Sequence, residues 1–203
     1  VETLRYRRDY YTSIVYPQIK NLSSESVEDS INRRLKEEFL GDFEGTEEET
    51  PEESEDDYSS TTEINFSVDK NKNLFVVCLD GYFYPIGAAH GSPYNTKYHI
   101  DLETGKFFEL KDLFKKDAPY KKTLTSIVND QRRKDLSVSR DLELDATYEI
   151  EAIENQDFKL SKDCLSLYYH PGEIDSYAAG FVFFDIPYGK LIDIIDVDGE
   201  MWN

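Results

Sequence analysis

The sequence is poor in the residue types that build metal centres and covalent catalytic sites. Two cysteines and three histidines occur among 203 residues. Cys78 and Cys164 fit no spaced metal-ligand motif, and none of the histidines stands in a zinc signature such as HExxH. The sequence also lacks a Gly-x-Ser-x-Gly elbow, a P-loop and a dinucleotide-binding fingerprint. We therefore expect no cofactor, no bound metal and no enzymatic activity.

Positive charge is scarce as well. The chain has 23 Lys and Arg against 42 Asp and Glu, for a net charge of -19. This balance argues against nucleic-acid binding, which needs clustered Lys and Arg side chains to neutralise phosphates. It also disfavours binding to anionic membrane surfaces. A cationic partner fits such a charge better, although solubility alone also explains it.

Long apolar runs are missing too. No stretch reaches the roughly 18 apolar residues of a transmembrane helix, so we expect no membrane span. The N-terminus has neither an initiator Met nor the apolar core of a signal peptide. We expect a processed or trimmed chain from which an anchor or leader has been removed.

The residues that are present suffice for a core, since 39% are hydrophobic and 14% aromatic. A helix is predicted between the N-cap candidates Ser23 and Ser24 and a stop at Gly41. Its apolar stripe repeats every four residues, at Val27, Ile31, Leu35 and Phe39. A second helix is predicted to begin near Asp117, with Pro119 in its first turn.

Strand patterns surround these helices. Residues 4–16 predict a strand broken by Pro17, and TTEINFSVD and NLFVVCLDGYFYPI predict a hairpin. TKYHIDLETGKFFEL predicts a second hairpin with its turn at 103–106, and the C-terminal part is β-rich. Cys78 and Cys164 lie in strand-like runs, where we favour two buried or unpaired thiols over a disulfide. Helices and strands do not alternate strictly, so the fold class is α+β, with a mainly antiparallel sheet and two packed helices.

The segment 44–57 (EGTEEETPEESEDD) stands apart in composition. It holds nine acids, no base and no aliphatic side chain. Such a run repels itself and buries nothing, so it predicts a disordered, solvated insertion rather than a cation-binding element. We place it at the end of a first lobe, residues 1–57, followed by a second lobe, residues 58–203.

A partner site is predicted where glycine-, serine- and proline-containing turns join strands, the loop Ile86–Asn95 and the turn near Ser176. Its residues are Gly87, Ala88, His90, Gly91, Ser92, Tyr94, Ser176 and Tyr177. The two tyrosines offer interface anchors, and the glycines allow close backbone approach. The alternative is structural: the glycines accommodate a tight backbone path and His90 bonds within the domain. His99 is expected to be a half-buried sheet residue and His170 a turn residue.

Two parts of the chain resemble known families. YPQIKNLSSESVEDSINRRLKEEF resembles the N-terminal module beside the catalytic domain of PdaC-type peptidoglycan deacetylases. The blocks GAAHGSPYNTKYHIDLETGKFFELKDLF and FKLSKDCLSLYYHPGEIDSYAAGFVFFDIPYGKLIDII are similar to the extracytoplasmic domain of RsiV-type anti-sigma factors. The deacetylase catalytic domain and the sigma-binding segment do not occur in this sequence. Ser176 stands where the second family commonly has proline.

The resemblance implies an extracytoplasmic α+β receptor of a bacterial cell envelope, exposed at the cell surface or anchored to the membrane in its parent protein. RsiV-type proteins bind lysozyme, a small basic protein to which an acidic domain is electrostatically matched. We therefore expect a sensing domain that binds lysozyme or another basic protein. The alternative is an accessory module that binds peptidoglycan carbohydrate beside a cell-wall enzyme.

Overall fold

The computed structural model describes residues 1–7, 11–41, 60–71, 74–138, 149–150 and 153–202. The predicted acidic loop 44–57 lies outside the described residues. The chain divides into two compact units, Val1–Phe107 and Phe108–Asn203, and each is described by itself. The sequence predicted a boundary between two lobes at residues 57–58. The contacts divide the chain elsewhere because the strands that follow residue 60 join the sheet begun by the N-terminal strands.

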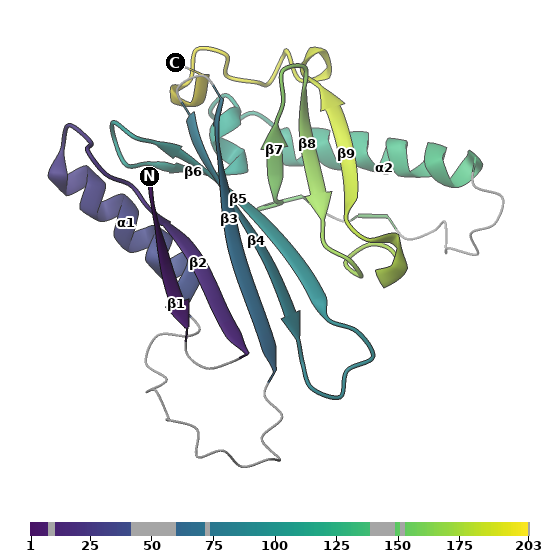
Figure 1. The fold of residues 1–203 in the computed structure, drawn as a ribbon. Helices are drawn as coiled ribbons and strands as arrows, with labels where there is room; N and C mark the ends of the chain where they lie inside the picture. Colours follow the sequence, from purple (N-terminus) through teal and green to yellow (C-terminus); the bar gives the residue numbers. More distant parts are fainter. Residues whose placement is uncertain (8–10, 42–59, 72–73, 139–148, 151–152, 203) are drawn as a thin grey trace. The chain divides into compact units, whose positions relative to one another are not determined.

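The first unit is a sheet with one helix (Figure 1). Its elements are β1 (Glu2–Arg7), β2 (Thr12–Gln18), α1 (Glu25–Leu40), β3 (Thr61–Asn71), β4 (Leu74–Tyr84), β5 (Ser92–Asp101) and β6 (Phe107–Phe108), whose two residues lie on either side of the unit boundary. The strands stand in the order β1-β2-β3-β4-β5-β6. The pairs β1–β2, β3–β4 and β4–β5 are antiparallel, whereas β2 and β3 are parallel and α1 belongs to the connection between them. Both predicted hairpins are confirmed.

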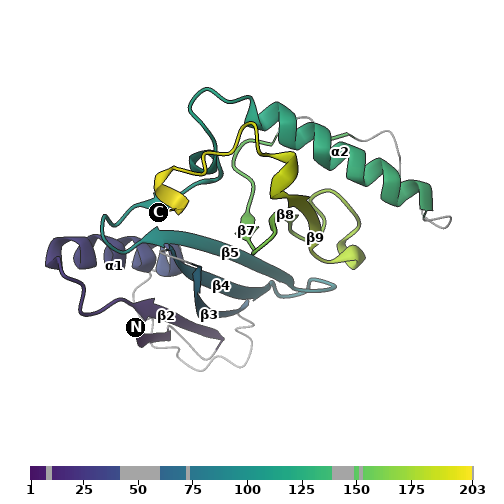
Figure 2. The ribbon, with the colours of Figure 1, turned by 90° about the horizontal axis from the view of Figure 1, so that it is seen from above.

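Helix α1 forms where the apolar stripe predicted it. The Ser24 side chain accepts a hydrogen bond from the backbone N–H of Val27, which caps the first turn, and the helix ends at Gly41. Ile31, Leu35 and Phe39 are buried against strand residues that include Ile14 and Val77. The helix covers one face of the sheet, as Figure 2 shows from above. These contacts make the core of the first unit.

The prediction of one N-terminal strand broken at Pro17 was wrong. Two strands form, β1 and β2, and Pro17 lies inside the second, opposite Thr3. Proline interrupts a sheet by lacking a backbone N–H on a paired edge. On its other side β2 pairs with β3 only from Thr12 to Ile14, so Pro17 lies beyond the part of β2 that this neighbour engages.

The second unit packs a three-stranded antiparallel sheet against a helix. It contains η1 (Leu110–Leu113), α2 (Tyr120–Val138), β7 (Phe158–Leu160), β8 (Cys164–Tyr169), η2 (Tyr177–Ala179), β9 (Val182–Pro187), η3 (Tyr188–Lys190) and η4 (Glu200–Trp202). Gln131 on α2 donates to the backbone oxygen of Asp185 on β9 at 2.8 Å. Leu124 and Leu165 are among its fully buried side chains. The two helices and the largely antiparallel strands confirm the α+β fold class.

Candidate functional site

A cleft opens in the first unit at the C-terminal end of α1. Its volume is about 730 Å³, which falls within the range of about 300–1,000 Å³ typical of small-ligand sites. The lining comes from the last turn of α1 and the neighbouring ends of three strands: Glu37, Glu38, Phe39, Gly41, Thr62, Ile64, Leu79, Phe83, Ser92 and Tyr94. The strand residues share one face because side chains alternate along a strand. That face is the one α1 covers elsewhere.

The floor of the cleft is apolar. Phe39, Ile64 and Leu79 are buried in the core of the unit. Phe83 is 40% exposed and Tyr94 is half-buried, so both offer ring surface to a ligand. Tyr94 lies over Gly81 of the adjacent strand, where a Cβ atom would approach its ring to about 2.0 Å. The absence of a side chain at Gly81 therefore leaves the room that the tyrosine ring occupies at the cleft.

The rim is acidic. Glu37 and Glu38 stand in the last turn of α1, which is described in full and contains no basic residue. Glu38 is held by Arg34 at 3.5 Å and by the Tyr98 hydroxyl, which donates at 3.1 Å. The backbone carbonyls at a helix C-terminus carry partial negative charge of their own. Aromatic surface beneath negative charge suits a ligand with an apolar face and a cation.

The predicted loop Ile86–Asn95 contributes two of its residues to this cleft, Ser92 and Tyr94. Both were expected in a loop, but β5 begins at Ser92, which pairs with Phe83, and Tyr94 pairs with Gly81. In this part of the strand pair the tyrosine ring covers the bare backbone of Gly81. Tyr94 is therefore a residue of the sheet and not, as the sequence predicted, an aromatic residue on a loop.

The remaining predicted site residues of this loop make contacts within the loop and with the neighbouring strand. Gly87 has φ of 76°, a conformation that favours glycine. Ala88 accepts a hydrogen bond from the Tyr84 hydroxyl at 2.9 Å through its backbone oxygen. Gly91 is buried against Tyr82, and a Cβ there would lie 2.4 Å from the tyrosine ring. His90 is exposed, and its Nδ1 lies 3.2 Å from the Gly91 backbone oxygen.

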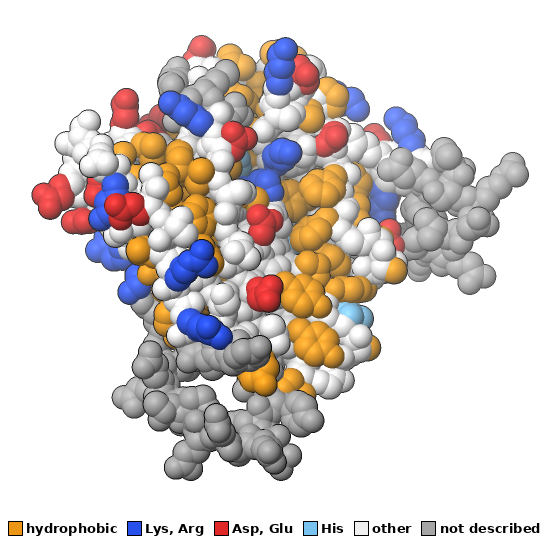
Figure 3. Space-filling view, viewed as in Figure 1, with side chains coloured by type: hydrophobic (Ala, Val, Ile, Leu, Met, Phe, Trp, Pro, Cys, Tyr) orange, Lys and Arg blue, Asp and Glu red, His pale blue; other side chains and the backbone are white. Residues whose placement is uncertain are grey.

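Ser176 and Tyr177 belong to the second unit. Ser176 precedes the short helix η2, and its backbone oxygen accepts from the Ala179 N–H at 3.0 Å. Gly180 ends the turn with φ of 70°. Hydrophobic side chains gather over β8 and β9 nearby (Figure 3), and Phe183 is 56% exposed. This surface and the cleft lie in different units.

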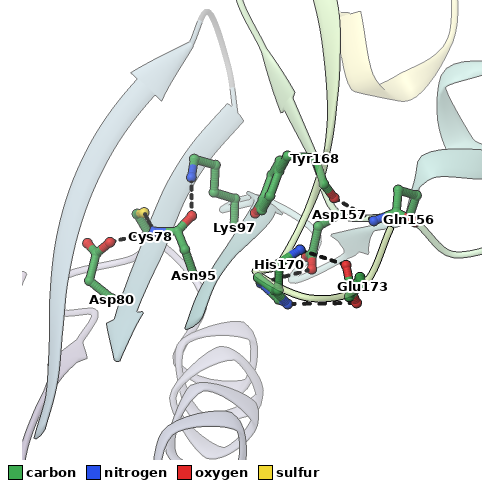
Figure 4. Close-up of polar contacts among 9 residues, drawn as sticks. All are labelled: Cys78, Asp80, Asn95, Lys97, Gln156, Asp157, Tyr168, His170 and Glu173. Atoms are coloured by element: carbon green, nitrogen blue, oxygen red, sulfur yellow. Dashed lines mark hydrogen bonds and ion pairs between the residues drawn. The ribbon is translucent and has the colours of Figure 1, made fainter. Parts of the chain in front are cut away.

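Each unit also contains a cluster of polar side chains joined by hydrogen bonds or ion pairs (Figure 4). In the second unit, His170 lies 3.8 Å from a carboxylate oxygen of Asp157 and 4.0 Å from one of Glu173, and its backbone N–H donates to Glu173 at 2.6 Å. The sequence predicted a turn residue there, and His170 does open a turn, since its backbone oxygen accepts from the Glu173 N–H. Asp157 and Glu173 thus contact the imidazole directly, and these three side chains are not arranged to hold a metal ion.

In the first unit, Asn95 links three side chains on the sheet face opposite α1. It donates to the Cys78 sulfur at 3.2 Å and to Asp80, and it accepts from Lys97. Cys78 and Cys164 are both free and half-buried, as favoured from the sequence. His99, on the same strand, is 1% exposed rather than half-buried, and burial, aided by the Lys97 ammonium, lowers its pKa to about 4.

A second groove runs along α2 in the second unit. It has a volume of about 540 Å³ and is lined by Lys121, Lys122, Thr125, Ser126, Asn129, Arg133 and Glu149. Two of its cations are already paired: Lys121 lies 2.8 Å from Glu154, and Arg133 contacts Asp130 and Glu149. Asn129 is buried and bonds both backbone groups of Ile150. The groove therefore presents mainly side chains with partners of their own.

Some kinds of site do not occur in the described part of the chain. Among those residues, no three His, Cys, Asp or Glu side chains come together in a way that would hold a metal ion. Neither of the described helices has the length and apolar character needed to cross a membrane.

Sequence reasoning missed the parts of the cleft that come from elsewhere in the chain. Glu37, Glu38 and Phe83 were not among the predicted site residues. One signal was available, since two acids in the last turn of a helix oppose its dipole. The proximity of that turn to the strand ends depends on tertiary packing and leaves no local signature.

The chain is similar to a peptidoglycan deacetylase and to solved structures. It is 25% identical over 174 residues, 84% of its length, to the peptidoglycan-N-acetylmuramic acid deacetylase PdaC of Bacillus subtilis (strain 168), of which it spans about a third (35%). A DUF3298 family crystal structure from Bacteroides fragilis is 25% identical, with a TM-score of 0.64, over 91% of this chain and 83% of that one. A Pseudomonas aeruginosa PAO1 structure of the same family, at 15% identity, shares the fold with a TM-score of 0.67, over 96% and 93%.

The family model itself matches part of the second unit. The matching residues, 111–189, run from the short helix η1 through α2 and the three-stranded sheet to η3. The resemblance to deacetylase-associated modules is thus supported by a relative, and that to RsiV-type proteins remains a sequence interpretation. Residues 111–189 match the model of the family described as "Protein of unknown function (DUF3298)".

Proposed function

We propose that this chain is an extracytoplasmic accessory domain of a bacterial cell-envelope protein and that it binds peptidoglycan glycan without transforming it. The observation that carries the proposal is the cleft beside α1, with Phe83 and Tyr94 on its floor. Flat aromatic side chains in an open cleft suit the apolar faces of sugar rings. The relationship to a peptidoglycan deacetylase supports the choice of ligand.

A second candidate is the recognition of a basic protein such as lysozyme. The net charge of -19 and the acidic rim at Glu37 and Glu38 favour it, because opposite charges accelerate and orient protein association. The resemblance to RsiV-type receptors gives the same expectation. In this function the domain acts as a sensor.

A co-sedimentation assay with purified wall sacculi, set beside a pull-down with lysozyme, separates the two functions. Phe83→Ala removes exposed ring surface from the cleft, and we expect it to weaken sacculus binding by more than about 2 kcal/mol if Phe83 is a central anchor. Tyr94→Ala is less suitable because Tyr94 also packs on Gly81.

Phe183→Ala is the matched control, since Phe183 is an exposed aromatic on β9 of the other unit. Sacculus binding that survives Phe83→Ala and fails with Phe183→Ala would move the site to the β8–β9 surface. Binding of lysozyme alone would favour the sensor. Hydrolysis or deacetylation of peptidoglycan by the purified chain would refute both functions.

A further inference from the structure

The electrostatics of the cleft narrow the kind of glycan it takes. We propose that the cleft selects sugars whose amino group is free and positively charged over the same sugars with the amino group acetylated. The inference rests on the proposed glycan-binding function and adds a chemical preference to it. It places the amine of the ligand at Glu37.

The end of α1 carries unusual charges. Cations stabilise a helix C-terminus, because the last carbonyl groups leave it partly negative. The last turn of α1 instead holds Glu37 and Glu38 and no base. Two carboxylates at this position repel the helix end, and a ligand cation in the cleft would relieve that repulsion.

The two glutamates differ in their availability. Glu38 already accepts from Tyr98 and pairs with Arg34. Glu37 is exposed, and no hydrogen bond or ion pair involves its carboxylate within the described part of the chain, although its backbone oxygen accepts from the Gly41 N–H at 2.8 Å. Glu37 is therefore the carboxylate left to meet a ligand, while Glu38 is held in place beside it.

The remaining lining suits the rest of a sugar. Phe83 and Tyr94 provide ring surface and Ser92 provides a hydroxyl at the strand end. Acetylation converts an ammonium group into a neutral amide and removes the charge that Glu37 would pair with. A neutral amide also donates a single hydrogen where an ammonium donates three. The preference should therefore arise from charge at the rim rather than from the floor.

The probes are glucosamine oligomers and N-acetylglucosamine oligomers of equal length, titrated into the full chain at about pH 6. At this pH ordinary amines are protonated and ordinary carboxyls are ionised. We expect the free-amine oligomer to bind about three- to fivefold more tightly, which is the strength of an exposed ion pair. Raising the salt to about 1 M should remove the difference, because it shortens the screening length to about 3 Å.

Glu37→Gln should abolish the preference for the free-amine oligomer, so that the two oligomers bind this variant equally. Glu63→Gln is the matched control: it removes the same charge from an exposed residue of β3 between Thr62 and Ile64, on the opposite face of the strand. Circular dichroism of each variant establishes that it folds. Loss of the preference in both variants would show a general charge effect and overturn the assignment to Glu37.

Other outcomes separate this inference from the proposed function. Equal binding of both oligomers, with sacculus binding intact, would overturn the amine preference and leave the glycan-binding function standing. Binding of neither oligomer nor sacculi would overturn both. A preference that persists in Glu37→Gln would place the amine elsewhere in the cleft and refute the inference as stated.

Discussion

Acid should destabilise this protein through one buried histidine. His99 is 1% exposed, and burial, with the adjacent Lys97 charge, lowers its pKa from 6.5 to about 4. An unfolded chain takes up a proton at this imidazole near pH 6.5, whereas the folded chain resists protonation until about pH 4. The stability that the neutral imidazole provides is therefore complete above pH 6.5 and is lost as the pH falls toward 4.

The size of the loss follows from the two pKa values. At pH 4.5 the unfolded state binds a proton at His99 more readily than the folded state does. This lowers the free energy of unfolding by about 2–3 kcal/mol for this one group. That is a large part of the 5–15 kcal/mol by which ordinary domains are stable. Urea unfolding followed by far-ultraviolet circular dichroism at pH 7.5 and pH 4.5 measures the loss.

The matched variant is His99→Gln, which keeps a polar side chain and removes the titration. It should lose about 2–3 kcal/mol less than the wild type between the two pH values, whatever its stability at pH 7.5. Lys97→Gln should raise the pKa of His99 and so reduce the acid loss. Parallel pH profiles for the wild type and His99→Gln would refute the reasoning, because they would show that the folded protein admits the proton freely.

Three further perturbations test the packing and the sequence interpretation. Gly81→Ala should cost about 1–3 kcal/mol in urea unfolding, because its Cβ would meet the Tyr94 ring, and the cost should shrink in a Tyr94→Ala background. An equal cost in both backgrounds would contradict that contact. Asn129→Leu should cost about 1–3 kcal/mol by leaving both backbone groups of Ile150 without their side-chain partner, whereas an unchanged unfolding midpoint would show that another group replaces it. Deletion of residues 44–57, chosen from their charge alone, should change the melting temperature little; a loss beyond about 1 kcal/mol would mean that the acidic run contributes packing.

Local sequence patterns predicted where helices and strands form better than they predicted which neighbours those elements have and how deeply their residues are buried. The four-residue stripe and the serine cap were enough to place α1, because both signals lie within the helix itself and its first cap. Pro17 misled the prediction of the first strand, since its effect depends on which neighbour β2 pairs with. The burial of His99 was underestimated for a related reason: alternation assigns a face to a strand residue but does not say how completely that face is covered.

The candidate site shows the same limit. Ser92 and Tyr94 were predicted from loop composition and do line the cleft, although as strand residues. The acidic rim and Phe83 come from segments more than forty positions apart in sequence, and they meet because α1 packs on the sheet. Gly91 was predicted to allow close backbone approach at a partner site, and in the structure it lies against the Tyr82 ring inside the domain.

The parallel pairing of β2 with β3 has a consequence for how the first unit assembles. The strands β3, β4 and β5 are joined in sequence by short connections, so their ladders close small loops, whereas Ile14 must find Ile64 across the whole of α1 and the residues that follow it. The entropic penalty of loop closure grows only logarithmically with length, but contacts between distant residues slow folding. The three-stranded meander should therefore act as the template, and the β1–β2 hairpin and its helix should dock onto it afterwards. Lengthening the connection after α1 would then slow that docking while hardly altering the final stability.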